Sequence, residues 1–277
     1  MPKSVRDIRL MKNSKKITVI TAYDYTTAHL CDKAGVDILL VGDSAGMVML
    51  GYENTIPVTM EQMCLFTEAV SRGRQNPLVV ADMPFMSYQS SKSQAIENAG
   101  RLIKSGADAV KLEGGAEIKD TVHAIVEIGI PVMGHIGFQP QTTTLQEGYK
   151  VQAKTKDSAL RLIEAAKALE EAGAFSIALE MVTKEVSKMI SSSIRIPTIG
   201  IGSGPDCDGQ VLVVHDVLGL YEKIKPKFAK RYLELSSDIV KALESYNNDV
   251  VSGKFPGSEH CFSMDKSELE RLKKEIV

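Results

Sequence analysis

The sequence predicts a (β/α)8 TIM barrel, an α/β fold in which eight parallel strands alternate with helices around a closed core. Eight short runs rich in Val, Ile and Leu recur along the chain, and polar stretches of helical length separate them. Continuous apolar runs are typical of strands that are buried on both faces, as in a parallel sheet. The length of 277 residues also suits one barrel domain, which commonly takes about 250 residues.

The predicted strands lie at 17–23, 37–43, 77–84, 108–115, 131–137, 175–181, 197–204 and 210–216. Between them, the segments 91–104, 117–128 and 156–172 have apolar residues at helical spacing. Gly106 and Gly173 each follow such a segment just before a strand, where a left-handed residue often ends a helix. This alternation is typical of consecutive βα units.

A doubly wound open sheet is the second choice of fold. That fold usually has a glycine-rich turn directly after its first strand, whereas this chain has TAYDYTTA there. A closed barrel also leaves no exposed sheet edge. We expect one domain over residues 1–277, with a helix within 1–16 that caps one mouth of the barrel. The C-terminal segment 217–277 should hold a helix near 227–247 and a shorter one from Lys266.

Charge and cysteine usage argue against several classes of function. Basic and acidic side chains number 33 and 35, which gives a net charge of -2. The basic stretch 223–231 is interpreted as a solvated helical face and not as a nucleic-acid site. The four cysteines lack metal-ligand spacing, and no apolar run approaches the roughly 20 residues that cross a membrane. We expect a cytoplasmic protein with free thiols that binds neither nucleic acid nor membrane.

Polar side chains lie at or near the carboxyl ends of five successive predicted strands. Catalytic groups of a (β/α)8 barrel come from the carboxyl ends of its strands, so these side chains are the candidate site. Several carboxylates that converge on one barrel mouth require a positive partner, because an unpaired buried charge is costly. The candidates, in chain order, are Asp43, Ser44, Asp82, Lys111, Glu113, His135 and Glu180.

Oxygen-rich ligation with no cysteine and one histidine predicts a hard cation, and Mg2+ fits better than Zn2+. Less specific explanations stay open for individual residues. Asp43 or Asp82 alone could be a helix N-cap. Lys111 and Glu113 point to the same side of one strand, so they could form an internal ion pair.

Glu180 lies among apolar neighbours in SIALEMV, a setting that favours a raised carboxyl pKa and a role as general base at a C–H bond. For His135, a hydrogen-bonded core histidine is the favoured explanation. The glycine-rich GIGSG at 200–204 is consistent with an anion cradle or with a tight turn, and the two explanations have equal weight.

Longer motifs cover nearly the whole chain and resemble the ketopantoate hydroxymethyltransferase family. They are VGDSAGMVMLGYENTIPVTMEQM, VVADMPFMSY, VKLEGG, PVMGHIGFQPQ, GYKVQAKT, LEMV and PTIGIGSGPDCDGQVLVVHD. The resemblance implies transfer of a hydroxymethyl group from 5,10-methylenetetrahydrofolate to 3-methyl-2-oxobutanoate through a Mg2+-stabilised enolate. The product would be 2-dehydropantoate, on the route to pantothenate and coenzyme A.

The same resemblance assigns roles to the candidate residues. The metal-binding acids fall on Asp43, Asp82 and Glu113. The substrate contacts fall on Asp43, Ser44, Asp82 and Lys111, and the catalytic base falls on Glu180. A ring-like homo-oligomer, a decamer, is also implied. Departures from the family pattern in 146–155 and 205–207 bear on the folate contacts more than on the acid cluster.

Two other functions are possible for this sequence. A lyase of the isocitrate lyase or phosphoenolpyruvate mutase type is similar in using a Mg2+-bound 2-oxo acid enolate, but the chain lacks a KKCGH-like cysteine motif. A non-catalytic barrel that holds an organic anion at GIGSG is the other rival. It predicts no solvent exchange at C3 of any oxo acid.

Overall fold

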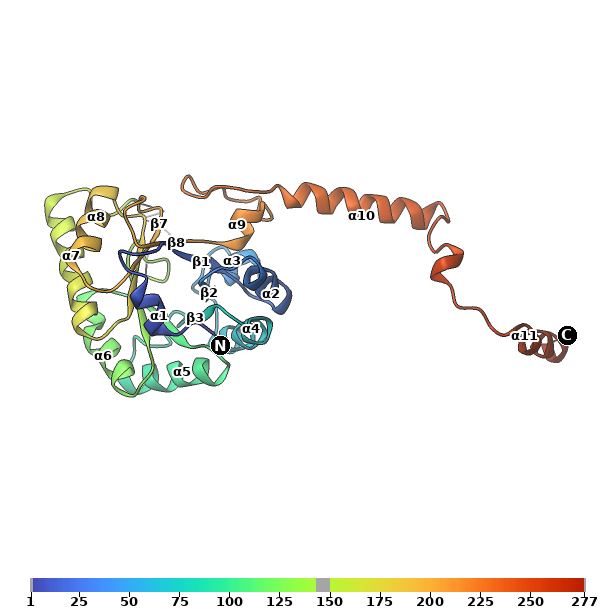
Figure 1. Ribbon diagram of the computed structural model, residues 1–277, viewed down its shortest axis with the longest axis horizontal. Coiled ribbons are helices and arrows are strands. Elements are labelled where there is room, and N and C mark those ends of the chain that lie inside the picture. The colour runs from blue at the N-terminus through green and yellow to red at the C-terminus, as the bar shows by residue number, and fades with distance from the viewer. Residues whose placement is uncertain (1, 143–149, 277) are drawn as a thin grey trace. The chain divides into compact units, whose positions relative to one another are not determined.

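The computed structural model describes residues 2–142 and 150–276. The chain forms two compact units, Met1–Tyr232 and Leu233–Val277. The first unit is the barrel, and the second consists of helices and connecting segments (Figure 1). None of the helices in the described residues is long and apolar enough to cross a bilayer.

Eight parallel strands close the barrel in sequential order, with β8 hydrogen-bonded to β1. The predicted (β/α)8 fold is therefore confirmed, and the strands begin within two residues of the predicted positions. They are β1 Ile17–Thr21, β2 Ile38–Val41, β3 Leu78–Asp82, β4 Ala109–Glu113, β5 Val132–Gly137, β6 Ser176–Glu180, β7 Thr198–Ile201 and β8 Gly209–Leu212.

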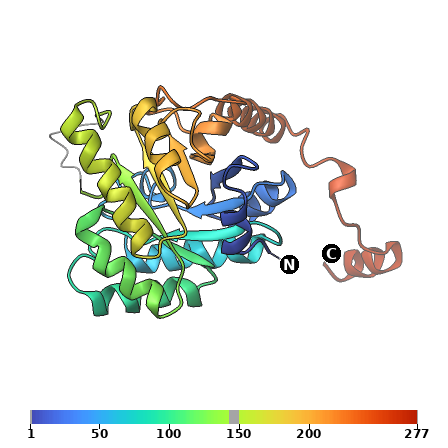
Figure 2. The same cartoon turned by 60° about the vertical axis from the view of Figure 1, so that its left-hand side comes forward.

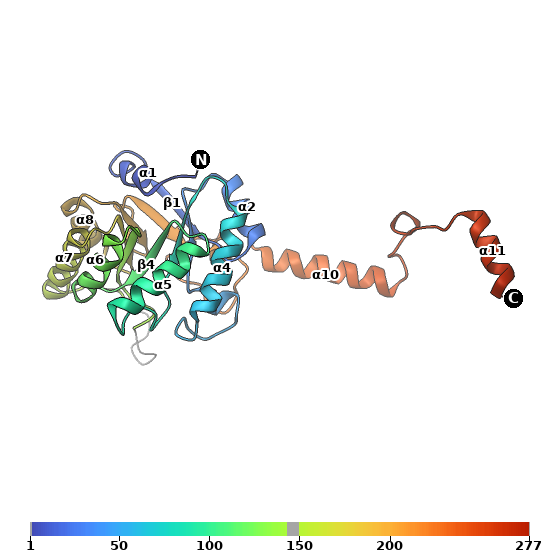
Figure 3. The ribbon, with the colours of Figure 1, turned by 90° about the horizontal axis from the view of Figure 1, so that it is seen from below.

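The helices of the barrel lie outside the strands, with α4, α5 and α6 along one side (Figures 2 and 3). Gly106 and Gly173 both have the expected left-handed φ, +102° and +96°. The helices are α2 Tyr25–Lys33, α3 Ala45–Val48, α4 Met60–Gly73, α5 Lys92–Lys104, α6 Lys119–Glu127, α7 Lys156–Glu171, α8 Lys184–Ser193 and α9 Val214–Leu218, with the 3-10 turn η1 Ala116–Ile118 before α6.

The predicted end of the last strand was wrong. The run 210–216 has the pattern of one apolar strand, but β8 stops at Leu212 and α9 begins at Val214. The backbone N–H of Val214 donates to Thr21 Oγ1 at 3.0 Å, so the chain leaves the sheet to bond a side chain of the neighbouring strand. Gly219 then ends α9 with a left-handed φ of 66°.

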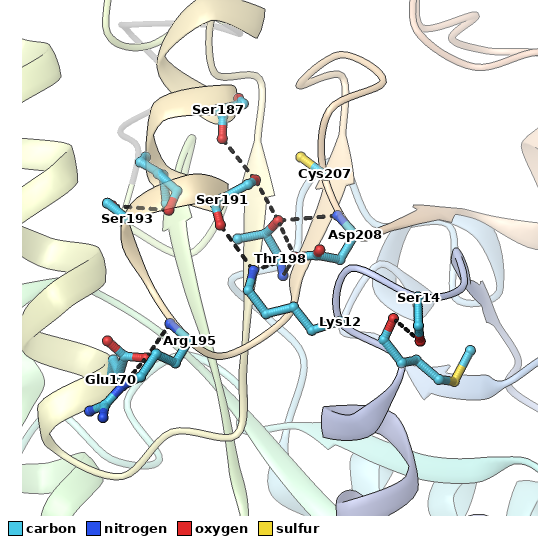
Figure 4. A network of polar contacts seen from close by, with 12 residues as sticks. Lys12, Ser14, Glu170, Ser187, Ser191, Ser193, Arg195, Thr198, Cys207 and Asp208 are labelled. Atoms are coloured by element: carbon cyan, nitrogen blue, oxygen red, sulfur yellow. Dashed lines mark hydrogen bonds and ion pairs between the residues drawn. The ribbon is translucent and has the colours of Figure 1, made fainter.

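Helix α1, Val5–Leu10, packs against the amino-terminal end of the barrel interior. Ile8 is fully buried among side chains that fill the barrel interior, including Ile17 and Ile38. Lys12 follows the helix, and its Nζ lies 2.8 Å from Asp208 Oδ2 at the start of β8 (Figure 4). Both side chains of this ion pair are buried, so α1 is fixed to the base of the barrel.

Strand side chains alternate between two apolar cores. Those facing the helices include Leu39, Leu112 and Leu179, and those inside the barrel include Val80, Ala109, Met133 and Ala178. Because alternate residues of a strand share a face, the position two residues beyond each interior side chain also faces inward. The interior of the barrel is thus apolar at its base and polar at the carboxyl ends of the strands.

The second unit contains α10 Leu235–Val251, the 3-10 turn η2 Ser258–His260 and α11 Lys266–Ile276, and none of their described residues is buried. The helix predicted near 227–247 begins eight residues later. The reason is tertiary contact: Tyr232 N donates to Val217 O at 2.8 Å, and the Phe228 ring packs against Gly202. These contacts hold 219–232 against the barrel without helical structure.

Candidate active site

The seven candidate residues meet at one cavity. Asp82 ends β3, Lys111 and Glu113 lie on β4, and His135 and Glu180 lie on β5 and β6, all facing into the barrel. Asp43 and Ser44 follow β2 and complete the wall. The cavity has a volume of about 140 Å³, which is small and suits a compact organic acid. The seven side chains chosen from strand ends thus line one cavity, and their roles stay predictions.

Asp82 and Lys111 are cross-strand neighbours that form a buried ion pair. Lys111 Nζ lies 2.5 Å from Asp82 Oδ1, and the backbone N–H of Asp43 donates to Asp82 Oδ2 at 3.1 Å. Burial lowers the pKa of Lys111, but three nearby carboxylates outweigh this effect and raise it above its ordinary value. The nearest acidic partner of Lys111 is thus Asp82, and the predicted alternative of a simple pair with Glu113 is wrong.

Asp43 is buried at the cavity wall beside two other carboxylates. Its Oδ2 accepts a hydrogen bond from Gln141 Nε2 at 2.7 Å. Burial, reinforced by the charges of Asp82 and Glu113, raises the pKa of Asp43 well above its ordinary value. The adjoining helix α3 has no side-chain N-cap bond, so Asp43 is not the helix cap that was its alternative explanation.

Gln141 and Tyr88 connect the carboxylates, and sequence reasoning missed both. Gln141 N donates to Glu113 Oε2 at 3.0 Å, while its Nε2 bonds both Asp43 and the carbonyl of Met83. The Tyr88 hydroxyl lies 3.0 Å from Gln141 Oε1 and 2.9 Å from Glu113 O. The motifs GFQPQ and FMSY contain these residues. Because neither Gln141 nor Tyr88 lies at the end of a predicted strand, a search of strand ends does not find them.

His135 lies between two carboxylates and is more than a core histidine. Its Nδ1 is 3.4 Å from Glu113 Oε1 and its Nε2 is 3.1 Å from Glu180 Oε2. Neither contact has the alignment of a hydrogen bond, so the attraction is one of charge. Burial and Lys111 lower the pKa of His135, but the two carboxylates outweigh them and raise it to about 9.

Glu180 does not lie in the apolar pocket expected from SIALEMV. Its neighbour Leu179 faces the helices, because adjacent strand residues point to opposite faces. The carboxylate itself lies beside the His135 ring. Its side chain is 14% exposed, compared with 1% for Glu113, and it is therefore the more accessible of the two glutamates to a ligand in the cavity.

Ser44 is held by a buried tyrosine that was also missed. Tyr23 follows β1, and its hydroxyl lies 2.8 Å from Ser44 Oγ. Burial raises the pKa of Tyr23 well above its ordinary value, so the phenol stays protonated and can donate or accept. Tyr23 therefore fixes the position of the serine hydroxyl at the cavity wall.

The GIGSG segment is explained by its turn geometry. Gly202 and Gly204 have left-handed φ values of 65° and 83°, and a Cβ on either would lie within 3 Å of a neighbouring side chain. Ser203 Oγ donates to Leu179 O at 2.6 Å and accepts from Val182 N at 3.1 Å. These contacts favour the tight-turn explanation, and the anion cradle stays an unsupported prediction.

The donor set of the cavity fits Mg2+. Four carboxylates and two basic side chains line it, so the lining carries an excess of negative charge. Within residues 2–142 and 150–276, no three His, Cys, Asp or Glu side chains form a ready-made metal centre. Mg2+ needs no such cluster, because it keeps several waters and takes one or two carboxylates with substrate oxygens. The metal roles of Asp43, Asp82 and Glu113 stay predictions.

Two of the further cavities share lining residues with the acidic cavity. The larger, about 1250 Å³, is lined by apolar side chains of β1, β8 and α2 and by no acidic residue, so we do not place the chemistry there. The smaller, about 300 Å³, shares Ser44 and Met47 with the acidic cavity.

Solved structures share the fold at low sequence identity. Phosphonopyruvate hydrolase gives a TM-score of 0.62 at 13% identity, covering 100% of this chain and 96% of that one. A structure of the same enzyme with oxalate and Mg2+ gives 0.61 at 13% identity, with the same coverage. A 2,3-dimethylmalate lyase gives 0.57 at 15% identity and covers both chains fully.

Closer relatives are found by sequence. The 3-methyl-2-oxobutanoate hydroxymethyltransferase of Nitrosopumilus maritimus is 69% identical over 277 residues, which are 100% of this chain and 99% of the relative. That of Cenarchaeum symbiosum is 59% identical and covers 95% of this chain and 99% of its own length. That of Dehalococcoides mccartyi is 52% identical and covers both chains fully. The family model described as ketopantoate hydroxymethyltransferase matches residues 2–258. The chain belongs to the ketopantoate hydroxymethyltransferase family of enzymes.

Proposed function

We propose that this enzyme transfers a hydroxymethyl group from 5,10-methylenetetrahydrofolate to 3-methyl-2-oxobutanoate, giving 2-dehydropantoate for pantothenate synthesis. The observation that carries the proposal is the single cavity of about 140 Å³ that brings together acids, Lys111 and Ser44, in a chain of this family. A five-carbon oxo acid suits a cavity of this size and charge pattern.

A hydroxyl group and an ammonium group would orient the substrate. The carboxylate of the oxo acid is assigned to Ser44 Oγ, which Tyr23 positions, and to the Lys111 ammonium. Lys111 stays protonated because three carboxylates raise its pKa. It can therefore attract the substrate's negative charge while it remains paired with Asp82.

Glu180 is proposed as the base that removes the C3 proton. It is the more exposed glutamate of the cavity, so its carboxylate can approach a bound substrate. The His135 ring lies beside it, with Nε2 at 3.1 Å from Glu180 Oε2, and so restricts the position of the carboxylate. The proton moves from C3 to a Glu180 oxygen. The overall transfer consumes one water: both C–N bonds to the methylene carbon break, the electron pair left at C3 forms the new C–C bond, and the water oxygen becomes the hydroxyl. The proton from C3 and one proton of the water go to the two nitrogens of the departing tetrahydrofolate.

Asp43, Asp82 and Glu113 are proposed to hold Mg2+, directly or through water. When bound there, Mg2+ would withdraw electron density from the 2-oxo group and so make the adjacent C–H bond more acidic. The hard oxygen donors and the excess negative charge of the cavity lining support this assignment. Mg2+ is also present in the structure of the fold relative phosphonopyruvate hydrolase with oxalate.

Product formation tests the proposal directly. Purified protein with 3-methyl-2-oxobutanoate, 5,10-methylenetetrahydrofolate, water and Mg2+ should give 2-dehydropantoate and tetrahydrofolate, measured by mass spectrometry, and omission of either organic substrate or of Mg2+ should stop it. Cleavage of a 2-hydroxy dicarboxylate without folate would favour the rival lyase. That rival has no support from the cysteines, since none of the four lines the cavity.

The assembly and the compartment also belong to the proposal. We infer a homo-oligomer, a decamer as the family resemblance implies, because α10 and α11 bury none of their described residues and α10 exposes apolar side chains such as Leu243. All four cysteines are free thiols, which is compatible with the predicted cytoplasmic location.

A further inference from the structure

A second cavity opens beside the catalytic one and has a different chemical character. It has a volume of about 300 Å³, and Ser44 and Met47 line both cavities. Small-molecule pockets commonly start near 300 Å³, so the space fits one compact ring system. Its walls are mainly apolar and include Met47, Met181, Ile224, Pro226 and Phe228, and Lys227 adds one basic side chain. All of these residues belong to the barrel unit.

One carboxylate lines this apolar cavity. Asp216 lies on α9, just beyond the carboxyl end of β8, and is 8% exposed. Across the described residues, its side chain makes no hydrogen bond or ion pair, although Arg231 exerts a favourable longer-range attraction. An unpaired buried carboxylate is costly, and burial raises the pKa of Asp216 above its ordinary value. A residue with this cost and no internal partner is expected to serve a ligand.

The required ligand can be specified from these walls. It must have flat apolar faces that pack against Phe228 and the two methionines, as aromatic rings and thioethers favour. One edge must carry adjacent N–H donors, since a carboxylate accepts two parallel hydrogen bonds from such an edge. The aminopyrimidinone edge of a reduced pterin has this pattern.

We propose that Asp216 and this apolar cavity bind the pterin ring of the folate donor. This inference rests on the proposed function, because it assumes that a folate is the one-carbon donor. The Asp216 carboxylate accepts from the ring N–H and the exocyclic amino group of the pterin. The wall shared through Ser44 and Met47 then places the one-carbon unit next to the oxo acid. The two substrates thus occupy adjacent cavities, one lined by charged side chains and the other mainly by apolar ones.

Binding measurements on Asp216→Asn test this assignment. The probes are tetrahydrofolate and 6-methyltetrahydropterin, which lacks the aminobenzoylglutamate tail, and calorimetry gives both dissociation constants. The amide presents a donor to the pterin edge in place of an acceptor, so both constants should rise about 10- to 100-fold. Binding of 3-methyl-2-oxobutanoate with Mg2+ should change by less than about twofold. Glu222→Gln is the matched control, because it removes the same charge from an exposed position on the neighbouring segment.

Ile224→Arg provides a second variant that does not depend on the buried position. Ile224 is 42% exposed, so the fold should tolerate the change, while the long cationic side chain fills the cavity. It should weaken binding of both pterin probes while the oxo acid still binds.

Three outcomes would overturn the site. They are wild-type pterin affinity in both variants, weaker binding of tetrahydrofolate but not of 6-methyltetrahydropterin, and an equal loss of oxo acid binding in Asp216→Asn. If wild-type protein binds 6-methyltetrahydropterin through Asp216 but forms no 2-dehydropantoate, the proposed function fails while the pterin site stands.

Discussion

Gln141 is the residue through which the chain organises its acidic cavity. Its side-chain amide bonds Asp43, its backbone N–H bonds Glu113, and its Oε1 accepts from Tyr88. Hydrogen bonds to ligating carboxylates fix their orientation, and their loss typically lowers metal affinity about 10- to 100-fold. Gln141 is thus a positioning residue for two of the predicted Mg2+ ligands.

We therefore expect Gln141→Ala to raise the Mg2+ concentration needed for half-maximal activity about 10- to 100-fold, with a smaller effect on the rate at saturating Mg2+. Titration of activity with Mg2+ measures both. Thr142→Ala, an exposed change at the next position, should match wild type. A merely structural role for Gln141 would lower the saturated rate and leave the Mg2+ requirement unchanged.

At single positions, the sequence predicted which side chains converge but not how they are held. Lys111 and Glu180 could be found because they close strands, and strand ends of a barrel share one mouth. Tyr23, Tyr88 and Gln141 lie in loops, so no periodicity marks them. The apolar environment predicted for Glu180 is wrong, because adjacent residues of a strand point to opposite faces of the sheet.

Helix α2 is joined to the segment before β3 by a single carboxylate. Asp32 accepts hydrogen bonds from Asn76 Nδ2 at 2.8 Å and from the backbone N–H groups of Gln75 and Asn76. Burial tends to raise the pKa of Asp32, but these donors outweigh it and lower the pKa below its ordinary value of 3.8. The folded state therefore prefers the charged form.

A carboxyl group with a lowered folded-state pKa stabilises the fold above its unfolded-state pKa and loses that contribution as the pH falls through the folded-state value. Asp32→Asn should therefore unfold more easily at pH 7, by about 1–3 kcal/mol, and the difference from wild type should shrink below about pH 4. Urea unfolding at several pH values measures this. A difference that does not change with pH would exclude the charged form of Asp32 as its source.

Element boundaries followed the sequence where local signals agree with packing. Helix α5 begins at Lys92 after the N-cap Ser91, one residue from the predicted start. The end of β8 could not be predicted, because it depends on the contact of Val214 with Thr21, which is distant in the chain. The start of α10 could not be predicted either, because the contact of Tyr232 with Val217 lies in a segment without a periodic pattern.

For the whole molecule, the order of strands was predictable because a parallel barrel needs only the alternation of apolar runs and helices. The division at Tyr232 was not predicted, because no Ser-, Gly- or Pro-rich linker marks it. The exposed apolar side chains of α10 also give no signal in the sequence, since an amphipathic helix has the same pattern whether it packs within its own chain or against another.

We expect light scattering to give a mass of about ten times the 30.2 kDa chain. Leu243→Glu should reduce this mass, because Leu243 is 61% exposed and a buried charge at a contact between copies would be costly. Glu244→Gln is the matched control on the same helix. A wild-type mass of 30.2 kDa would contradict the oligomer.

The central claim, that Glu180 removes a proton from a Mg2+-bound 2-oxo acid, is tested most directly by deuterium exchange at C3 of 3-methyl-2-oxobutanoate in D2O. Wild-type protein with Mg2+ should exchange this proton, and a chelator should stop the exchange. Glu180→Gln should slow it by about 10²-fold or more while the oxo acid still binds, and Glu185→Gln, an exposed change on α8, should not. An unchanged rate of exchange in Glu180→Gln would contradict the claim.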